Sequence, residues 1–282
     1  MLQYFFLTRF NLELWDVNKH RMVMDKEKWM EERCELFEKY CLPSVAGQTD
    51  QDFTWIILCD HATEDCYQKK LIGYRKKCPQ IQLIQVRCTF SWDYADIFAD
   101  VIRHTVCRRG FNPLDVCITT MLDNDDAIHH KFVEYTKRRA KFLDFGTFLS
   151  YDYGLQYFNE LNMATRIWYP NNHFLSYVES VKRVRTCYGF GSHFLLEKQE
   201  GVKVCHIDSE TFPMWVETIH ENNVDNDVKM TTRTTFVRRP SYLKKYFNID
   251  QELCFNRNKF FVRFVFQMIR RMYEKIYPRE WK

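Results

Sequence analysis

Three aspartates lie within four residues at the end of an apolar run in the middle of the chain. Asp123, Asp125 and Asp126 follow residues 116–122, whose composition is typical of a buried strand. Because carboxylates are not buried without partners, we expect them where this strand leaves its sheet. A divalent cation relieves the repulsion between clustered carboxylates, and oxygen ligands suit Mg²⁺ and Mn²⁺, which also bind phosphate oxygens. The pattern predicts a metal-diphosphate site at the C-terminal edge of a sheet.

Three other interpretations of these acids are open. A calcium loop of the EF-hand kind needs a Gly where the chain has Ile128, and of its later ligands only Glu134 is present. A phosphatase-like site, with Asp123 as the nucleophile, would also follow a buried strand. The acids could equally form a solvated turn in which Asp125 or Asp126 caps the next helix.

The surrounding sequence predicts the elements that position the acids. Apolar runs predict strands, and apolar residues three and four apart predict helices, one of which is capped by Asp25 and ended by Pro43. Strands that alternate with helices predict an α/β fold with a mostly parallel sheet flanked by helices. The expected strands are 2–8, 53–59, 81–86 and 116–122, and the expected helices are 26–41, 93–107 and 127–142.

Three charged residues follow three of these predicted strands. Arg9, Asp60 and Asp123 each stand at the carboxyl end of an apolar run. In open α/β sheets, ligands bind outside the carboxyl ends of the strands. The agreement among separate strands strengthens the prediction of a binding site at this edge.

Composition sets the broad class of the protein. The chain has 282 residues, 46% of them hydrophobic, which is typical of a globular protein, and its net charge of +4 gives no reason to expect a nucleic acid partner. The 11 cysteines include no zinc-ligand spacing, so we expect free thiols in a reducing cytosol. No run approaches the ~20 apolar residues of a membrane span, and the expected location is therefore cytoplasmic.

Several segments resemble a known class of enzymes. The segments LPSVAGQT (42–49) and FTWIILCD (53–60) resemble the opening of nucleotide-sugar glycosyltransferases of the GT-A fold, and TMLDNDDA (120–127) is similar to their Asp-x-Asp strand end. More narrowly, residues 8–11, 29–44, 123–129 and 215–223 resemble the rhamnosyltransferase family. The resemblance covers roughly residues 1–230. Met121 is a departure, because many relatives have Arg there.

The resemblance implies a metal-dependent transferase that moves a sugar, rhamnose in the narrower family, from a nucleoside-diphosphate donor linked to UDP or dTDP. The acceptor would be a glycan or a lipid-linked molecule. At matching positions, the resemblance implies a nucleoside contact, a Mn²⁺ or Mg²⁺ site on the donor diphosphate, and a residue beside the sugar. Asp60 would contact the nucleoside, and Arg9 would contact the nucleotide or its phosphates. Asp123, Asp125 and His220 would hold the metal, and Asp123 would also contact the donor. Asp126 would face the sugar or stabilise the turn.

The general base of such an enzyme is not marked in the sequence. An inverting enzyme needs a group that takes the proton from the acceptor hydroxyl, and Asp208 and Glu217 are candidates, with Glu210 and Asp152 as further acids of the same kind. His220 also follows a strand-like stretch, where a histidine can simply be hydrogen-bonded in the core. Two other functions therefore remain open: a metal-dependent phosphohydrolase using Asp123, and a sugar-nucleotide-binding protein without catalysis.

The chain is expected to divide into a catalytic domain, 1–230, and a helical C-terminal extension, 231–282. In the extension, Phe261, Val265, Met268 and Met272 lie on one helical stripe, and several cations lie mostly off it. This helix could pack on the catalytic domain. Alternatively, it could lie on the inner membrane face as a basic amphipathic helix, which would give the protein a peripheral membrane contact.

Overall fold

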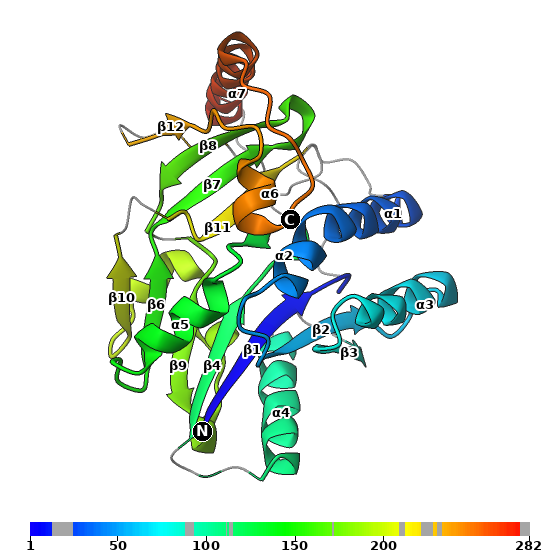
Figure 1. Ribbon diagram of the computed structural model, residues 1–282, viewed down its shortest axis with the longest axis vertical. Coiled ribbons are helices and arrows are strands. Elements are labelled where there is room, and N and C mark those ends of the chain that lie inside the picture. Colours follow the sequence, from blue (N-terminus) through cyan, green and yellow to red (C-terminus); the bar gives the residue numbers. More distant parts are fainter. Residues whose placement is uncertain are drawn as a thin grey trace.

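The computed structural model describes residues 1–12, 25–87, 93–110, 112, 115–170, 172–208, 212–220, 228–229 and 233–276. Over these residues the larger sheet has seven strands in the order β10-β6-β9-β4-β1-β2-β3 (Figure 1). All neighbours are parallel except β9, which is antiparallel to β4 and β6. The predicted mostly parallel sheet is thereby confirmed. The strands are β1 Leu2–Arg9, β2 Thr54–Asp60, β3 Ile81–Val86, β4 Val116–Met121, β6 Thr147–Tyr151, β9 Ser176–Ser180 and β10 Lys203–Ile207.

A second sheet was not predicted from the sequence. Within the described residues it has five strands in the order β12-β8-β7-β11-β5, and it stands beyond the C-terminal edge of the larger sheet in Figure 1. The aspartate turn leads from β4 in the first sheet directly into β5 in the second, so the acids lie at the junction of the two. The strands are β5 Ala127–Ile128, β7 Tyr153–Phe158, β8 Met163–Trp168, β11 Trp215–Ile219 and β12 Thr235–Phe236.

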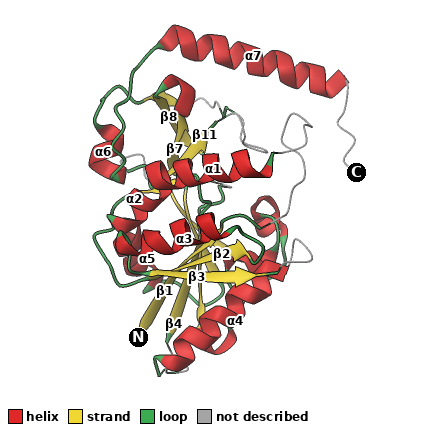
Figure 2. Ribbon diagram, turned by 90° about the vertical axis from the view of Figure 1, so that its right-hand side faces the viewer, coloured by secondary structure: helices red, strands yellow, loops and turns green. Residues whose placement is uncertain are grey.

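Helices cover both faces of the larger sheet (Figure 2). Alternate residues of β1 divide between two apolar cores: Phe6 packs with residues of α1, α2, α3 and α5, and Phe5 packs with residues of α4. This two-sided burial is typical of parallel sheets. The helices are α1 Lys26–Leu36, α2 Leu42–Ala46, α3 Asp65–Gly73, α4 Asp93–Arg108, α5 Phe132–Ala140, α6 Tyr242–Phe247 and α7 Arg257–Ile276.

Two predicted helix boundaries were wrong. Pro43 does not end the first helix, because a π-turn over Phe37–Cys41 shifts the hydrogen bonds and Pro43 then occupies the first turn of α2, where a missing N–H is tolerated. The helix predicted from residue 127 begins at Phe132 instead. Ala127 and Ile128 form β5, since both pair with β11, and this pairing overrides the local helical pattern.

The segment after residue 232 contributes to the second sheet. Strand β12 pairs with β8, and Leu243 and Phe247 of α6 pack against Leu155 and Tyr157 of β7. The division at residue 230 stays a prediction. No helix in the described part of the chain is long and apolar enough to cross a membrane. The ten cysteines that lie in the described ranges are free thiols.

Candidate active site

The aspartate turn is fixed by contacts to the end of β1. The Thr8 hydroxyl donates a hydrogen bond to the Leu122 carbonyl at 2.8 Å, and the Asn124 amide donates one at 2.6 Å to a main-chain carbonyl just after β1. Within the turn, the Asp126 N–H donates to the Asp123 carbonyl at 3.3 Å. These bonds hold three carboxylates close together at the C-terminal edge of the sheet.

Each aspartate of the turn has its own cationic partner from a different part of the chain. This arrangement answers the need of partly or fully buried carboxylates for compensating charge. Two of the partners are permanently charged arginines, and the third is a histidine that can lose its proton. The pairs are Asp123 Oδ1 with Arg9 Nη2 at 3.5 Å, Asp125 Oδ2 with Arg33 Nη1 at 2.6 Å, and Asp126 Oδ2 with His173 Nε2 at 2.8 Å.

Asp125 is held as a buried anion. Burial alone would raise the pKa of Asp125, but the charge of Arg33 and the hydrogen bond with His220 outweigh burial and lower it. The His220 Nε2 lies 2.9 Å from Asp125 Oδ2, and the Asp125 side chain is buried. The carboxylate is therefore engaged by α1 and by the residue after β11, and it ties these two elements to the turn.

Asp126 and His173 form a second buried pair. Burial raises the pKa of Asp126 to about 7, and the negative charge of Asp125 adds to that effect, against the opposing hydrogen bond with His173. The pKa of His173 is raised to about 9 because Asp126 outweighs the effect of burial. The other oxygen of Asp126 accepts a hydrogen bond from the Thr218 N–H of β11 at 2.8 Å.

His173 was not predicted as a site residue from the sequence. It is a lone histidine in the loop before β9, 47 residues from Asp126. The adjacent Asn172 fixes this loop, because its side-chain amide donates to Ser150 Oγ at 3.1 Å and to the Tyr151 carbonyl at 3.1 Å. A buried Asn beside the His is therefore what brings the imidazole to the turn.

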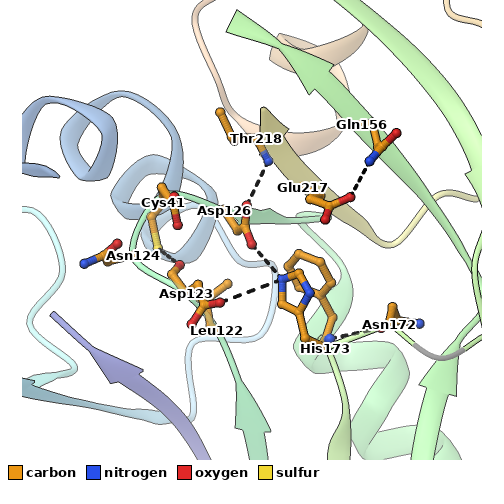
Figure 3. Close-up of polar contacts among 12 residues, drawn as sticks. Cys41, Leu122, Asp123, Asn124, Asp126, Gln156, Asn172, His173, Glu217 and Thr218 are labelled. Carbon is orange, nitrogen blue, oxygen red and sulfur yellow. Dashed lines mark hydrogen bonds and ion pairs between the residues drawn. The ribbon is translucent and has the colours of Figure 1, made fainter. Parts of the chain in front are cut away.

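Three of these side chains could hold a metal ion. One carboxylate oxygen each from Asp123 and Asp126 and one ring nitrogen of His173 lie within 4.8 Å of one another (Figure 3). Two oxygens and one imidazole nitrogen suit Mn²⁺, and they also suit Mg²⁺, which prefers oxygen. This group differs from the predicted metal ligands Asp123, Asp125 and His220, because Asp125 and His220 contact each other. That set stays a prediction.

Arg9 presents unused donor capacity beside the turn. Its guanidinium lies 4.8 Å from the ring centre of Tyr94 and 5.2 Å from that of Tyr188. The Arg9 Nε and the Tyr188 hydroxyl are buried, and neither finds a hydrogen-bond partner among the described residues. Buried donors without partners are costly, so an acceptor atom from a ligand would be stabilised here.

Asp60 lies at the end of β2, on the same edge of the sheet. Its carboxylate accepts a hydrogen bond from the Ala62 N–H at 2.7 Å and lies 3.2 Å from a ring nitrogen of His61. Among the contacts of the described residues, none joins Asp60 to the aspartate turn. The structure thus leaves Asp60 at the periphery of the group.

The two candidate bases lie in different environments. Glu217 is buried on β11, where it accepts a hydrogen bond from the Gln156 amide at 2.7 Å and forms an ion pair with Lys229. Figure 3 shows it on the same side of the turn as His173. Asp208 is 53% exposed and lies 3.5 Å from Arg233. Glu217 is thus brought to the turn, whereas Asp208 is not.

The other two acids considered as bases are Asp152 and Glu210. Asp152 follows β6 and accepts hydrogen bonds from Ser150 at 3.0 Å and from His206 at 2.8 Å. The second ring nitrogen of His206 contacts Glu197 at 2.7 Å. Glu210 lies outside the described residues.

Solved structures of TarS from S. aureus are similar to this chain. TarS 1–349 in complex with UDP matches with a TM-score of 0.45 and 10% sequence identity, over 77% of this chain and 60% of that chain. A second structure of TarS 1–349 matches with a TM-score of 0.44 and 9% identity over the same shares. The chain thus spans less than two thirds of TarS 1–349. No curated protein matches the chain.

A protein family covers most of the sequence. The family described as "Putative rhamnosyl transferase" matches residues 3–232. This range contains the whole aspartate turn, both arginines that pair with it, and both histidines that contact it. The resemblance to the rhamnosyltransferase family is confirmed over 230 of the 282 residues. The chain belongs to this family of glycosyltransferases.

Proposed function

We propose that the protein transfers a sugar, rhamnose in keeping with its family, from a nucleoside-diphosphate donor to a hydroxyl group of a glycan or lipid-linked acceptor. The observation that carries the proposal is the convergence of Asp123, Asp126 and His173 beside Arg9, at the sheet edge where α/β proteins bind ligands. The carboxylates would hold a cation, and the cation and Arg9 together would hold a diphosphate.

A divalent cation, Mn²⁺ or Mg²⁺, fits the residues present. Asp123, Asp126 and His173 offer it two oxygens and one nitrogen. When bound, the cation neutralises the negative charge that develops on the departing diphosphate. Asp125 differs from these residues because Arg33 and His220 already engage it, so we assign it to holding the turn in shape.

The donor nucleotide would extend along the carboxyl ends of β1 and β2. Arg9 has a buried Nε without a partner and is suited to a phosphate oxygen. Asp60, at the end of β2, is suited to a hydroxyl of the nucleoside. UDP and dTDP both meet these requirements, so both are tested below.

Glu217 is the base that we favour for an inverting transfer. A general base must lie within hydrogen-bond reach of the acceptor hydroxyl, and Glu217 precedes Thr218, whose N–H binds Asp126. Lys229 and Gln156 fix the orientation of its carboxylate. Asp208 is exposed and paired with Arg233, so it is the weaker candidate.

Calorimetric titration of UDP and dTDP, each with and without Mn²⁺, tests the donor site. The wild type should bind one nucleotide in a metal-dependent manner, and Asp126→Asn should lose that dependence. Asp144→Asn is the matched control, because Asp144 is exposed and pairs only with Lys203 at the surface. Equal binding by both variants, or binding that ignores Mn²⁺, would contradict the proposal.

Product analysis separates the proposed function from its two alternatives. Sugar transfer from UDP- or dTDP-rhamnose releases the nucleoside diphosphate and leaves no inorganic phosphate. Release of inorganic phosphate without transfer would favour the phosphohydrolase that uses Asp123. Tight nucleotide-sugar binding with no product, across a panel of glycan and lipid-linked acceptors, would favour a binding protein without catalysis.

A further inference from the structure

We propose that α7 binds, lying flat, to the surface of an anionic lipid bilayer. The helix presents a continuous set of apolar side chains to solvent, with exposed fractions from 38% to 69%. Such a surface is unusual for a soluble domain and indicates an interaction site. The exposed apolar residues are Phe261, Val262, Val265, Phe266, Met268, Ile269 and Met272.

The apolar stripe is not docked on the catalytic domain. The inward contact of α7 is narrow and lies near its beginning: Phe260 packs edge-on against Phe158 and Phe236, with ring centres 5.1 Å and 4.9 Å apart. Arg263 forms an ion pair with Glu160 on the same side. In Figure 2 the remainder of α7 runs along the outer edge of the molecule, away from the sheets. The helix is thus anchored by one edge, and none of the described residues covers its apolar stripe.

The charge of α7 identifies the partner. Within Arg257–Ile276 the sequence has six Lys and Arg residues and one Glu, a net charge of +5, while the whole chain carries +4. The other 262 residues together therefore carry −1. Clustered Lys and Arg residues near an anionic membrane surface are attracted to it. The net positive charge of this chain therefore lies on the helix that also exposes the apolar stripe.

The length of the helix agrees with an interfacial position. Twenty residues extend roughly 30 Å, but no described helix is apolar enough to cross a membrane. A helix with an apolar stripe and a basic remainder lies in the interface, with the stripe among the acyl chains and the cations at the headgroups.

A second copy of this chain is a poorer occupant of the stripe. Two α7 helices placed stripe to stripe would bring two charges of +5 together, and like charges at an interface oppose association. An anionic bilayer instead supplies both the apolar phase and the compensating charge. The inference rests on α7 alone and does not depend on the proposed sugar transfer.

Vesicle flotation of the full chain tests this inference. Phosphatidylcholine vesicles containing phosphatidylglycerol should bind the wild type, and pure phosphatidylcholine vesicles should bind it far less. The double variant Phe261→Ser/Phe266→Ser should lower binding to the mixed vesicles about tenfold or more, since both side chains would enter the acyl region. The matched control is Phe142→Ser/Phe145→Ser, which removes two exposed phenylalanines next to α5 and should bind as the wild type does.

Two further readouts complete the test. All four residues are exposed, so both double variants should keep the melting temperature of the wild type, which shows that lost binding is not lost folding. High salt should weaken the binding because it screens the cations. The inference is overturned if the wild type ignores anionic vesicles, if both double variants bind equally, or if light scattering finds a dimer that only Phe261→Ser/Phe266→Ser dissociates.

Discussion

Arg33 Nη1 lies 2.6 Å from Asp125 Oδ2, so a helix outside the sheet supplies the permanent charge for the middle aspartate of the turn. The same guanidinium nitrogen donates to Asn124 Oδ1 at 3.0 Å. Both side chains of the ion pair are largely buried. One cation therefore fixes two consecutive residues of the turn, and the position of α1 becomes part of the site.

Removing this cation should destabilise the fold. Arg33→Met leaves the Asp125 carboxylate buried with only His220 beside it, and we expect a loss of about 3 kcal/mol in the free energy of unfolding. The double variant Arg33→Met/Asp125→Asn should lose less, because no charge is left uncompensated. Denaturant unfolding of the wild type and the two variants measures both losses of free energy.

The control for this prediction is an exposed ion pair of the same type. Arg103 lies 2.9 Å from Asp100 on the surface of α4, and Arg103→Met should cost less than about 1 kcal/mol. If Arg33→Met were no more harmful than Arg103→Met, the role assigned to the buried pair would be wrong.

Metal affinity should distinguish the two histidines that contact the turn. With His173 as a ligand, His173→Ala should weaken Mn²⁺ binding by more than about tenfold, since even losing a residue behind a ligand has a cost of that order. His220→Ala should have a smaller effect on Mn²⁺ binding, because His220 contacts Asp125 and not the proposed ligands. The electron paramagnetic resonance signal of free Mn²⁺ gives the Mn²⁺ dissociation constants of both variants. The reverse order would restore the predicted set of Asp123, Asp125 and His220.

The rate of transfer should depend on Glu217 more than on Asp208. A general base contributes a factor of about 10²–10⁴ to kcat, so with Glu217 in the proposed role Glu217→Gln should lose that factor while the KM for the donor changes little. Asp208→Asn keeps the same shape at an exposed acid and should retain nearly full activity. If Asp208→Asn lost activity and Glu217→Gln kept it, Asp208 would be the general base instead.

A glycine in β7 makes room for the tryptophan that supports the His173 loop. A Cβ on Gly154 would lie 2.1 Å from the ring of Trp215, whose indole N–H donates to the Tyr151 carbonyl at 2.7 Å. Trp215 stacks on Phe174 at 4.9 Å, and the Phe174 ring is 4.2 Å from that of His173. The stacking on Phe174 and the hydrogen bond to Tyr151 hold the Trp215 ring in place.

Gly154→Ala should therefore lower the free energy of unfolding by about 1–3 kcal/mol, the usual cost of overpacking. Gly73→Ala is the control, since nothing lies within 4 Å of its added Cβ at the end of α3, and alanine there should be neutral or stabilising by up to about 1 kcal/mol. Thermal unfolding of the two variants compares them directly. Equal melting temperatures would show that Trp215 can shift to accommodate the added methyl group.

The sequence predicted four strands of the larger sheet, β1, β2, β3 and β4, because the information there is local, whereas β6, β9 and β10 were missed. Buried parallel strands are continuous apolar runs, and a charged residue such as Arg9, Asp60 or Asp123 marks where a run ends. The second sheet was missed because its strands carry Gln156, Thr165 and Glu217 among apolar residues and show no clean alternation. The buried charge of Glu217 is compensated only in the fold, by its ion pair with Lys229.

Some residues of the site could be predicted from the sequence, and others could not. The three aspartates and Arg9 are adjacent to strand ends and could be found from spacing. Arg33 and His173 could not, since they reach the turn from a helix and a loop, and no periodicity relates positions that only the tertiary fold brings together. A partner for each acid was required by electrostatics, but its identity was not encoded locally.

The stability of the fold should depend on pH through Glu179, a buried acid of β9. Its carboxylate accepts hydrogen bonds from the N–H groups of Arg185 at 2.7 Å and Thr186 at 3.0 Å. Thr186 has a φ of 67°, which side chains rarely adopt, so these bonds hold a strained turn. Two residues later, Tyr188 packs beside Arg9. Burial raises the pKa of Glu179 to about 7, against the opposing effect of both N–H groups.

The sign follows from this pKa. The folded state keeps a proton on Glu179 that the unfolded chain releases near its model value of 4.5, so the wild type loses stability as pH rises from about 4.5 to 7, by up to about 3 kcal/mol, and is level above that range. Glu179→Gln has no such proton. Relative to the wild type it should therefore gain several degrees in melting temperature between pH 5 and pH 8. Thermal unfolding at pH 5, 6, 7 and 8 measures the difference, and parallel curves across that range would show that the carboxylate stays ionised in the fold.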